Sequence, residues 1–262
     1  MSLLFLFITA LGLSLAMAGA WAVQRRTGAS GWIDTIWSFA VGAGGIGAVL
    51  AADGAAPRRI AAFVLIAAWS IRLGSHIFTR TKAGGEDPRY AKLIEDWGKA
   101  ASSRLFLFLQ IQAIAGLILV LAIYLAASNP SPVPHSLDLI GIVVALSALA
   151  GEAISDRQLS QFRKTPEAKT EICEEGFWRY SRHPNYFFEW LYWCAWPLLA
   201  LTAPSSISWA ALLAPAMMYW LLVYASGIPP LEDHMLRSRG DKFRALQRRV
   251  NAFFPGPRKE EA

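Results

Sequence analysis

The chain of 262 residues has few charges and few cysteines. Charged residues make up 17% and hydrophobic residues 55% of the sequence, whereas an average soluble domain carries about 25% charged residues. This composition excludes a disordered chain, a nucleic-acid-binding arm and most soluble enzymes. Cys173 and Cys194 are too few for a disulfide scaffold. Because no Cys-x-x-Cys pair or Cys/His cluster is present, we expect no structural zinc site.

Long apolar runs stand where a soluble protein would carry charge. A helix that crosses a bilayer needs about 20 mostly apolar residues, and seven stretches meet or approach that length. The sequence therefore predicts an all-α integral membrane protein, with seven transmembrane helices in one membrane domain over residues 1–262. The expected spans are Leu3–Val23, Trp32–Ala52, Ile60–Phe78, Leu105–Ala127, Leu137–Ile154, Phe187–Ala203 and Ile207–Ala225.

The distribution of lysine and arginine predicts the orientation. The net charge is +6, and 22 of the 25 Lys and Arg residues fall in segments on one side of a seven-span arrangement. Only Arg58 and Arg59 fall in the loops on the other side, and Arg72 lies within a span. The positive-inside rule then places the N-terminus outside and the C-terminus in the cytoplasm. The first span has no positive charge before its apolar run, so we expect a retained helix and not a signal peptide.

Polar side chains within the spans are candidates for function, because charges in a membrane are costly and face an interior or a cavity. Asp34 lies near the start of the second span, and Arg72 and His76 lie one helical turn apart in the third. Structural pairs, such as Asp34 with Arg72, are the alternative to a chemical role. Most of the 11 tryptophans are expected to be interface anchors or core. Trp37 and Trp69 are candidates to line a cavity for a flat apolar substrate.

A second polar group lies between the fifth and sixth spans, in residues 156–189. Its cationic groups stand beside aromatic rings, which suits a ligand with phosphates and flat rings, because Arg binds phosphate in a bidentate manner and stacks on aromatic faces. Contact with anionic lipid headgroups is the alternative for any single Lys or Arg. For Arg179–Glu189, which mixes Arg, His, Asn, Tyr and Glu, we favour a ligand site.

The stretch Gly42–Gly47 matches the pattern G-x-G-x-x-G of dinucleotide-binding proteins. That pattern has its meaning only between a strand and a helix, and here it lies in the middle of a span. Small residues at three- and four-residue spacing let membrane helices pack closely. We therefore expect this stretch to serve helix packing.

The segment SDRQLSQFRKTPE (155–167), followed by EEGFWRYSRHPNYFFEW (174–190), resembles the C-terminal half of the membrane steroid 5-alpha-reductases and of their bacterial relatives of the DUF1295 type. The tail, with Glu232, Arg237, Phe243 and the Phe-Phe-Pro of 253–255, fits the same pattern. The resemblance is strong over about residues 150–255. It is weaker over the first half, where the best anchors are residues 37–41, 76–81 and the Gly-Glu-Asp-x-Arg-Tyr motif of Gly85–Tyr90.

The resemblance implies an enzyme that reduces the C=C bond of a 3-oxo-Δ4-steroid or a similar enone with NADPH. In this family a hydride passes to the β-carbon and a proton to the α-carbon. The resemblance implies a substrate cavity in about residues 1–130 and NADPH binding by about residues 131–262. The cofactor site then maps onto Arg80, Asp156, Arg163, Lys164, Tyr180, Arg182, His183, Asn185, Tyr186, Glu189 and Glu232.

Roles for some of these residues follow from their chemistry. Arg163 and Lys164 are expected to bind phosphates, and Asn185 and Glu189 to hydrogen-bond the carboxamide or a ribose. On the substrate side the resemblance, together with the position of these side chains in the early spans, points to Trp37, Trp69 and Arg72.

The chain departs from the steroid enzymes where those bind the carbonyl. The steroid enzymes carry a Gln-Glu pair at the start of the second span, where this chain has Asp34 and Thr35. Their tyrosine in the third span falls near His76 or Ile77, and Ile77 cannot donate a proton. A protonated Asp34 is therefore the first expected proton donor, since burial favours the neutral acid, and His76 is the second.

Two other functions remain open. A membrane methyltransferase of the isoprenylcysteine type shares the Arg-His-Pro-x-Tyr run but uses S-adenosylmethionine, which has no phosphates. The segment from Asp156 to Arg163-Lys164 therefore favours the reductase. The other alternative is a non-catalytic protein that binds lipids or sterols. The expected partners of the reductase are an apolar enone and membrane lipids, without nucleic acid. We expect a monomer in a bacterial inner membrane, with a site open to the cytoplasm.

Overall fold

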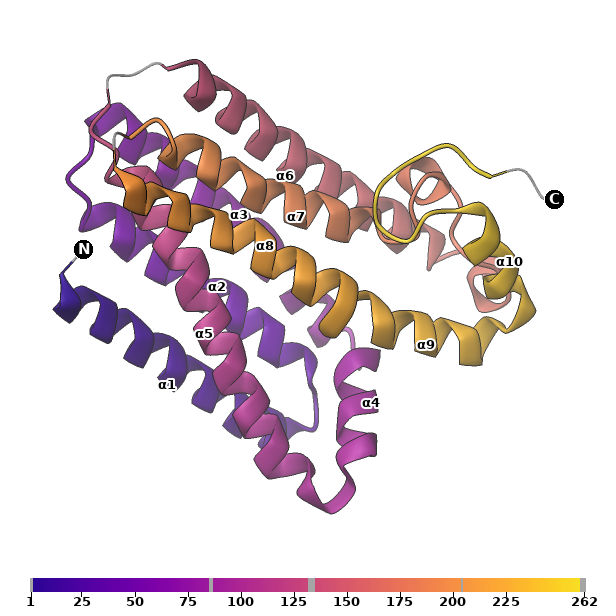
Figure 1. The fold of residues 1–262 in the computed structure, drawn as a ribbon. Coiled ribbons are helices and arrows are strands. Elements are labelled where there is room, and N and C mark those ends of the chain that lie inside the picture. Colours follow the sequence, from indigo (N-terminus) through magenta and orange to yellow (C-terminus); the bar gives the residue numbers. More distant parts are fainter. Residues whose placement is uncertain (1, 85–86, 132–134, 204, 260–262) are drawn as a thin grey trace. The chain divides into compact units, whose positions relative to one another are not determined.

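The computed structural model describes residues 2–84, 87–131, 135–203 and 205–259, and all regular structure in these ranges is helical (Figure 1). The expected all-α class is confirmed for this part of the chain. Short 3₁₀ turns cover Gly98–Ala100, Pro166–Lys169, Gly176–Arg179 and Ser206–Leu212, and Leu221–Ala225 is π-helical. The α-helices are α1 (Leu3–Thr27), α2 (Gly31–Leu50), α3 (Ala56–Lys82), α4 (Pro88–Trp97), α5 (Ala101–Ala127), α6 (Ser136–Phe162), α7 (Pro184–Ala200), α8 (Leu213–Trp220), α9 (Ile228–Arg239) and α10 (Asp241–Arg249).

Within these ranges, six helical stretches are long and apolar enough to cross a membrane. They support a multi-pass membrane protein and match six of the seven expected spans. The remaining expected span falls on α7, which has 17 residues. At 1.5 Å per residue α7 is about 25 Å long, which is less than the ~30 Å of a hydrocarbon layer. The seventh span and the orientation of the termini stay predictions. The six stretches are Leu3–Thr27, Gly31–Leu50, Ala56–Lys82, Pro88–Ala127, Ser136–Phe162 and Ser206–Arg239.

Two helices, α1 and α4, begin at residues whose side chains cap them. Ser2 precedes α1, and its hydroxyl accepts a hydrogen bond from the Phe5 amide at 3.2 Å. Gly28 ends α1 with a φ of 73°, a conformation that suits glycine. Asp87 caps α4 by accepting from the Arg89 amide at 3.0 Å, and Pro88 takes the first helical position. The last of these caps places a charged loop next to the site described below.

The chain folds into two compact units. Unit 1 consists of Met1–Val143 and Cys194–Ala214, and unit 2 of Val144–Trp193 and Pro215–Ala262. In unit 1, α2 packs against α3 and α5, and α1 packs against α2 and α5. In unit 2, α10 packs against α9 over a hydrophobic cluster formed by Phe243, Leu246, Val250, Ile172, Met235 and Leu236.

Glycines bring α2 close to α3. A Cβ on Gly42 would lie 2.1 Å from the Ser70 Oγ, and one on Gly45 would lie 2.7 Å from the Ile66 Cγ1. These positions accept no larger side chain without displacing the neighbouring helix. The expectation that the glycine-rich stretch serves helix packing is confirmed at these two residues.

The two arginines expected in an outer loop lie instead in the first turn of α3. Arg58 is 4% exposed and forms an ion pair with Asp138 at the start of α6. It also donates to the Leu199 carbonyl at 2.9 Å. A buried charge needs such partners, because removing an ion from water is costly. Arg58 therefore joins three segments of unit 1.

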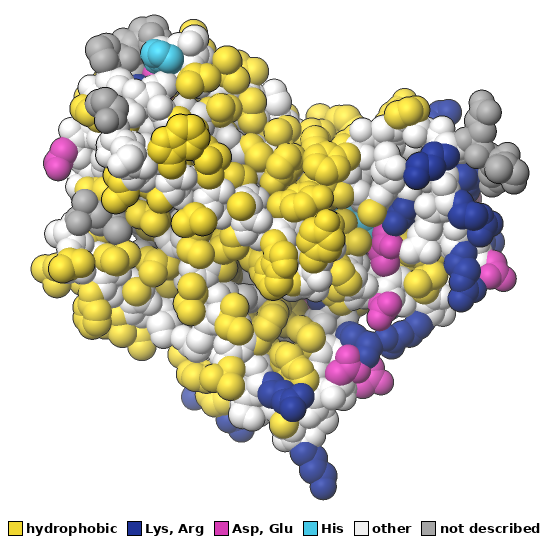
Figure 2. All heavy atoms as spheres, in the orientation of Figure 1, with side chains coloured by type: hydrophobic (Ala, Val, Ile, Leu, Met, Phe, Trp, Pro, Cys, Tyr) yellow, Lys and Arg dark blue, Asp and Glu magenta, His cyan; other side chains and the backbone are white. Residues whose placement is uncertain are grey.

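Hydrophobic side chains cover much of the visible surface (Figure 2). On α1, Leu4, Phe7, Leu11 and Leu15 are exposed at a spacing of three or four residues, which forms a stripe along one helix face. Lys and Arg gather over α9 and α10 (Figure 2). The exposed apolar stripe suits contact with lipid, since soluble monomers rarely expose large apolar patches.

Candidate functional site

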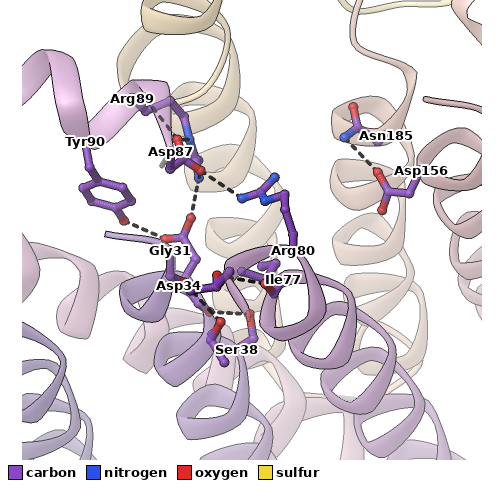
Figure 3. Close-up of polar contacts among 12 residues, drawn as sticks. Gly31, Asp34, Ser38, Ile77, Arg80, Asp87, Arg89, Tyr90, Asp156 and Asn185 are labelled. Carbon is purple, nitrogen blue, oxygen red and sulfur yellow. Dashed lines mark hydrogen bonds and ion pairs between the residues drawn. The ribbon is translucent and has the colours of Figure 1, made fainter. Parts of the chain in front are cut away.

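Asp34 is at the centre of a polar cluster in unit 1 (Figure 3). It lies in the first turn of α2, where the helix dipole favours a negative charge. The Tyr90 hydroxyl donates to its Oδ1 at 2.6 Å, and Arg89 donates to its Oδ2 through a guanidinium nitrogen. Both donors come from α4. An ion pair that is also hydrogen-bonded is typical of an ionised carboxylate.

Asp34 is placed to accept hydrogen bonds. One of its oxygens accepts from a hydroxyl and the other from a guanidinium. Its expected role as proton donor stays a prediction, and the neighbours of Asp34 supply hydrogen-bond donors beside it.

Tyr90 is one such neighbour. It is 3% exposed, and its oxygen accepts a hydrogen bond from the Gln112 side-chain amide at 2.9 Å. Gln112 lies on α5, and its Oε1 is buried without a hydrogen-bond partner among the described residues. The Tyr90 ring contacts Phe108 edge-on, with ring centroids 6.3 Å apart. The hydroxyl is thus held between Gln112 and Asp34, in a largely apolar setting.

Two arginines balance the two acids of this cluster. Asp87 accepts from Arg89 Nη2 at 2.8 Å and from Arg80 Nη2 at 2.9 Å (Figure 3). Burial raises the pKa of Asp87, but the guanidinium groups of Arg89 and Arg80 outweigh burial and hold that pKa well below its usual range. Arg80, expected at the cofactor, is thus paired with Asp87 in unit 1. With Asp34 included, the formal charges of the four side chains sum to zero.

The aromatic residues predicted on the substrate side lie beside this cluster. The Trp37 indole donates to the Gln112 backbone carbonyl at 3.0 Å. Trp69 is fully buried and meets Trp37 edge-on, with centroids 6.1 Å apart. Arg72 and His76 lie one turn apart on α3, half-buried, and each has contacts of its own. The structure therefore brings together Asp34, Trp37 and Trp69 around Gln112 and Tyr90.

A second cluster, in unit 2, is built on Arg182. The Arg182 Nε donates to Glu232 Oε1 at 2.7 Å. Its Nη1 donates to the backbone carbonyls of Gln247, at 3.3 Å, and of Val250. The Gln247 side chain donates to the other oxygen of Glu232 at 2.7 Å. Because these groups satisfy one another, Arg182 and Glu232 join the loop before α7 to α9 and α10.

His183 belongs to the same cluster. Its Nε2 lies 3.2 Å from Glu232 Oε1, and its ring stacks on Tyr186 with centroids 5.7 Å apart. Burial lowers the pKa of His183 and the charge of Arg182 lowers it further, more than Glu232 raises it. The neutral imidazole is therefore favoured, and four residues of the predicted cofactor site, Arg182, His183, Tyr186 and Glu232, are brought together.

The acids and amides of α6 and α7 form a third group in unit 2. The Asn185 amide donates to Asp156 Oδ1 at 3.1 Å (Figure 3). One turn further along α7, Glu189 accepts from the Trp193 indole at 2.8 Å. Asp156 and Glu189 are 7% and 6% exposed. Buried polar groups of this kind need hydrogen-bond partners, and here Asn185 and Trp193 supply them.

The three remaining residues predicted for the cofactor are exposed. Arg163 and Lys164 directly follow the end of α6, and Tyr180 lies in the loop before α7, 46% exposed. The exposed cations Arg163 and Lys164 suit the charged end of a ligand. The buried acids Asp156 and Glu189 suit a neutral polar end. We therefore regard α6, α7 and their connecting loop as the candidate cofactor site.

Sequence reasoning missed Tyr90, Arg89 and Gln112. Tyr90 and Arg89 belong to the Gly-Glu-Asp-x-Arg-Tyr motif, which was used only to support the resemblance. Residues 85 and 86 of this motif lie outside the described part of the chain. Gln112 carried a usable signal, because a polar side chain in an apolar span is itself a candidate for function. Gln247 had no such signal, since it lies in a polar tail.

Residues 20–250 match the model of a protein family described as "Protein of unknown function (DUF1295)". No curated protein and no solved structure matches the chain. The family match runs through the helices that carry both polar clusters of unit 2 and the Asp34 cluster of unit 1. The chain is therefore a member of the DUF1295 family.

Proposed function

We propose that this protein reduces the C=C bond of an apolar enone with NADPH, and that its substrate is of the 3-oxo-Δ4-steroid class. The DUF1295 family is associated with steroid 5-alpha-reductase-like proteins, which supports the reaction type. The observation that carries the cofactor assignment is the donor set of α6 and α7. It combines exposed cations, Arg163 and Lys164, with the buried Asp156 and its hydrogen-bond partner Asn185.

The residues of unit 2 fit a phosphorylated dinucleotide. Arg163 and Lys164 are open to solvent and suit phosphate, which both side chains bind well. The Asn185 amide and the Glu189 carboxylate suit the carboxamide or a ribose hydroxyl. S-adenosylmethionine has no phosphates for these two side chains to bind. NADPH is therefore the better match to this set of residues.

The protein's part in the reaction is position and electrostatics. NADPH, when bound, supplies the hydride for the β-carbon of the enone. The arriving electron pair moves negative charge to the carbonyl oxygen, and a hydrogen-bond donor aimed at this oxygen stabilises it. Trp37, which is half-buried and backed by the buried Trp69, offers apolar surface against which a flat ring system can pack. Such surroundings exclude water that would compete for the donor.

Binding of NADPH by purified variants tests this proposal. Asn185→Ala and Glu189→Gln should each raise the Kd for NADPH about tenfold or more, because each loses hydrogen bonds worth about 1.5–3 kcal/mol. The matched control is Asp241→Asn, which changes an exposed acid of the same unit on α10 and should leave the Kd unchanged. Unchanged affinity in both test variants would contradict the cofactor assignment.

Turnover tests the substrate class. We expect consumption of NADPH with progesterone or testosterone, and less with enones that lack a fused ring system. The competing functions give different results. A methyltransferase would be stabilised against heat by S-adenosylmethionine and not by NADPH. A non-catalytic sterol-binding protein would bind the steroid and oxidise no NADPH.

A further inference from the structure

We infer that the Tyr90 hydroxyl, positioned by Asp34 and Gln112, is the donor that binds the substrate's carbonyl oxygen. The inference rests on the proposed function, because it names the carbonyl-binding group of that reaction. It places the hydrogen-bond donor to the carbonyl on α4, 56 positions beyond Asp34 along the chain. Asp34 becomes a positioning residue, which acts through Tyr90.

The contacts of the hydroxyl support this role. The Tyr90 oxygen has one proton, and in the ligand-free protein this proton is donated to Asp34 at 2.6 Å. The Gln112 amide donates to the same oxygen at 2.9 Å and fixes its place. When a carbonyl oxygen replaces Asp34 as acceptor, Arg89 remains on the carboxylate, so Asp34 keeps a charged partner. The hydroxyl can therefore turn to a ligand without leaving a buried charge alone.

The charge balance of the cluster suits a developing negative charge. The carboxylate of Asp34 on its own would repel an enolate. Arg89 and Arg80 together offset Asp34 and Asp87, to which they are bound within 3 Å. A donor that is fixed before the reaction and shielded from water stabilises charge more than water does. The Phe108 ring, which meets the Tyr90 ring edge-on, and the 3% exposure of Tyr90 supply that shielding.

The reaction balances without a proton from Asp34. The hydride brings its electron pair to the β-carbon, and the π electrons of the C=C bond form a new double bond between the α-carbon and the carbonyl carbon. The carbonyl π pair moves to oxygen, where the Tyr90 hydroxyl donates to it. A proton from water then adds to the α-carbon and the carbonyl re-forms. Tyr90 keeps its proton throughout, so no acid has to be regenerated.

The test compares Tyr90→Phe with Tyr124→Phe. The first change removes only the hydroxyl from the cluster, and the second removes a hydroxyl from another buried tyrosine of unit 1, on α5. For Tyr90→Phe we expect kcat to fall about 100- to 1000-fold, with the Kd for NADPH unchanged. Tyr124→Phe should keep wild-type turnover. A kcat within twofold of wild type for Tyr90→Phe would overturn the inference and leave the proposed function standing.

A binding measurement separates the inference from the proposed function. Wild type should bind a saturated steroid ketone about tenfold more tightly than the same steroid with the oxygen removed, and Tyr90→Phe should lose this preference. If wild type oxidises no NADPH with any enone, the proposed function fails. The preference for the ketone then remains as the test of whether Tyr90 binds a carbonyl oxygen. Equal affinities of wild type for the two steroids would overturn the inference.

Asp34 and Gln112 provide the second set of variants. Asp34→Asn keeps an oxygen that accepts from Tyr90 and should keep most of the ketone preference, whereas Asp34→Ala should lose it. A merely structural Asp34 would leave the preference unchanged in both. If Tyr90→Phe does not fold, Gln112→Leu replaces it, since this change removes the amide that fixes the Tyr90 oxygen. An unaltered ketone preference in Gln112→Leu would then contradict the inference.

Discussion

At the scale of single residues, the state of ionisation decides what each polar cluster can do. Asp34 accepts from two donors, whereas Tyr90, beside it, has a hydroxyl proton to donate. In unit 2, His183 lies beside the carboxylate of Glu232, a contact that favours a charged histidine. Burial has the larger effect, however, and favours the neutral form of His183. The same residue types would behave differently on the surface, where water stabilises either form.

The neutral state of His183 predicts a dependence of stability on pH. Below its ordinary pKa of 6.5 a histidine in the unfolded chain takes up a proton, while the folded His183, whose pKa is lowered, still resists protonation. Because the unfolded state then binds more protons, the free energy of unfolding should fall as the pH drops from 7 to 5. Thermal unfolding in detergent measures this slope.

His183→Asn should make the pH slope less steep, since the titrating group is gone. The matched control is His234→Asn, which replaces an exposed histidine on α9 and should keep the wild-type slope. Glu232 and Arg182 face His183 and stay in place in both variants. An equal slope for wild type and His183→Asn would show that other groups govern the acid sensitivity.

At the scale of helices, close packing and short connections place the polar residues. Gly42 and Gly45 let α2 approach α3, and α2 carries Asp34 and Trp37. The short helix α4 is tied to Asp34 through Arg89 and Tyr90. A shift of α2 would therefore move Asp34 relative to its partners on α4, so helix packing and site geometry depend on each other.

Gly42→Leu tests this dependence. Its Cβ alone would lie 2.1 Å from the Ser70 Oγ, so α2 and α3 have to separate. Overpacking of this kind costs about 1–3 kcal/mol, which corresponds to a fall in Tm of about 2–12 °C for a chain of this size. The control is Gly12→Ala on α1, where a Cβ meets nothing within 4 Å; it should leave the Tm unchanged or raise it slightly. Equal melting of both variants would argue against close α2–α3 packing.

At the scale of the whole molecule, the distribution of charge predicts how the chain lies in its membrane. Residues 226–259, the segment around α4 and the loop before α7 should lie on the cytoplasmic side. Single cysteines at Ser238 and Ser205, both exposed, test this in a chain with Cys173 and Cys194 replaced by serine. In intact cells an impermeant thiol reagent should label Ser205→Cys and not Ser238→Cys. The reverse pattern would invert the predicted orientation.

The sequence predicted the helical class and most spans, because both depend on local hydropathy. It also predicted which loop holds the Arg182 cluster, since Arg182, His183 and Asn185 are close in sequence. It could not predict the partner of Asp34, because 56 residues separate it from Tyr90 and no local pattern links them. The burial of Arg58 was missed for the same reason, since its partner Asp138 is 80 residues away.

The segment that follows α10 gives the chain a late step in its assembly. Arg182 donates its backbone amide to the Asn251 carbonyl, and the Ser181 hydroxyl donates to the Phe253 carbonyl. The ribosome makes these acceptors after it has made the described helices α1 to α10. Until they emerge, the loop before α7 lacks several of its hydrogen bonds. A chain interrupted at this point would carry an open loop of the kind that proteases cut.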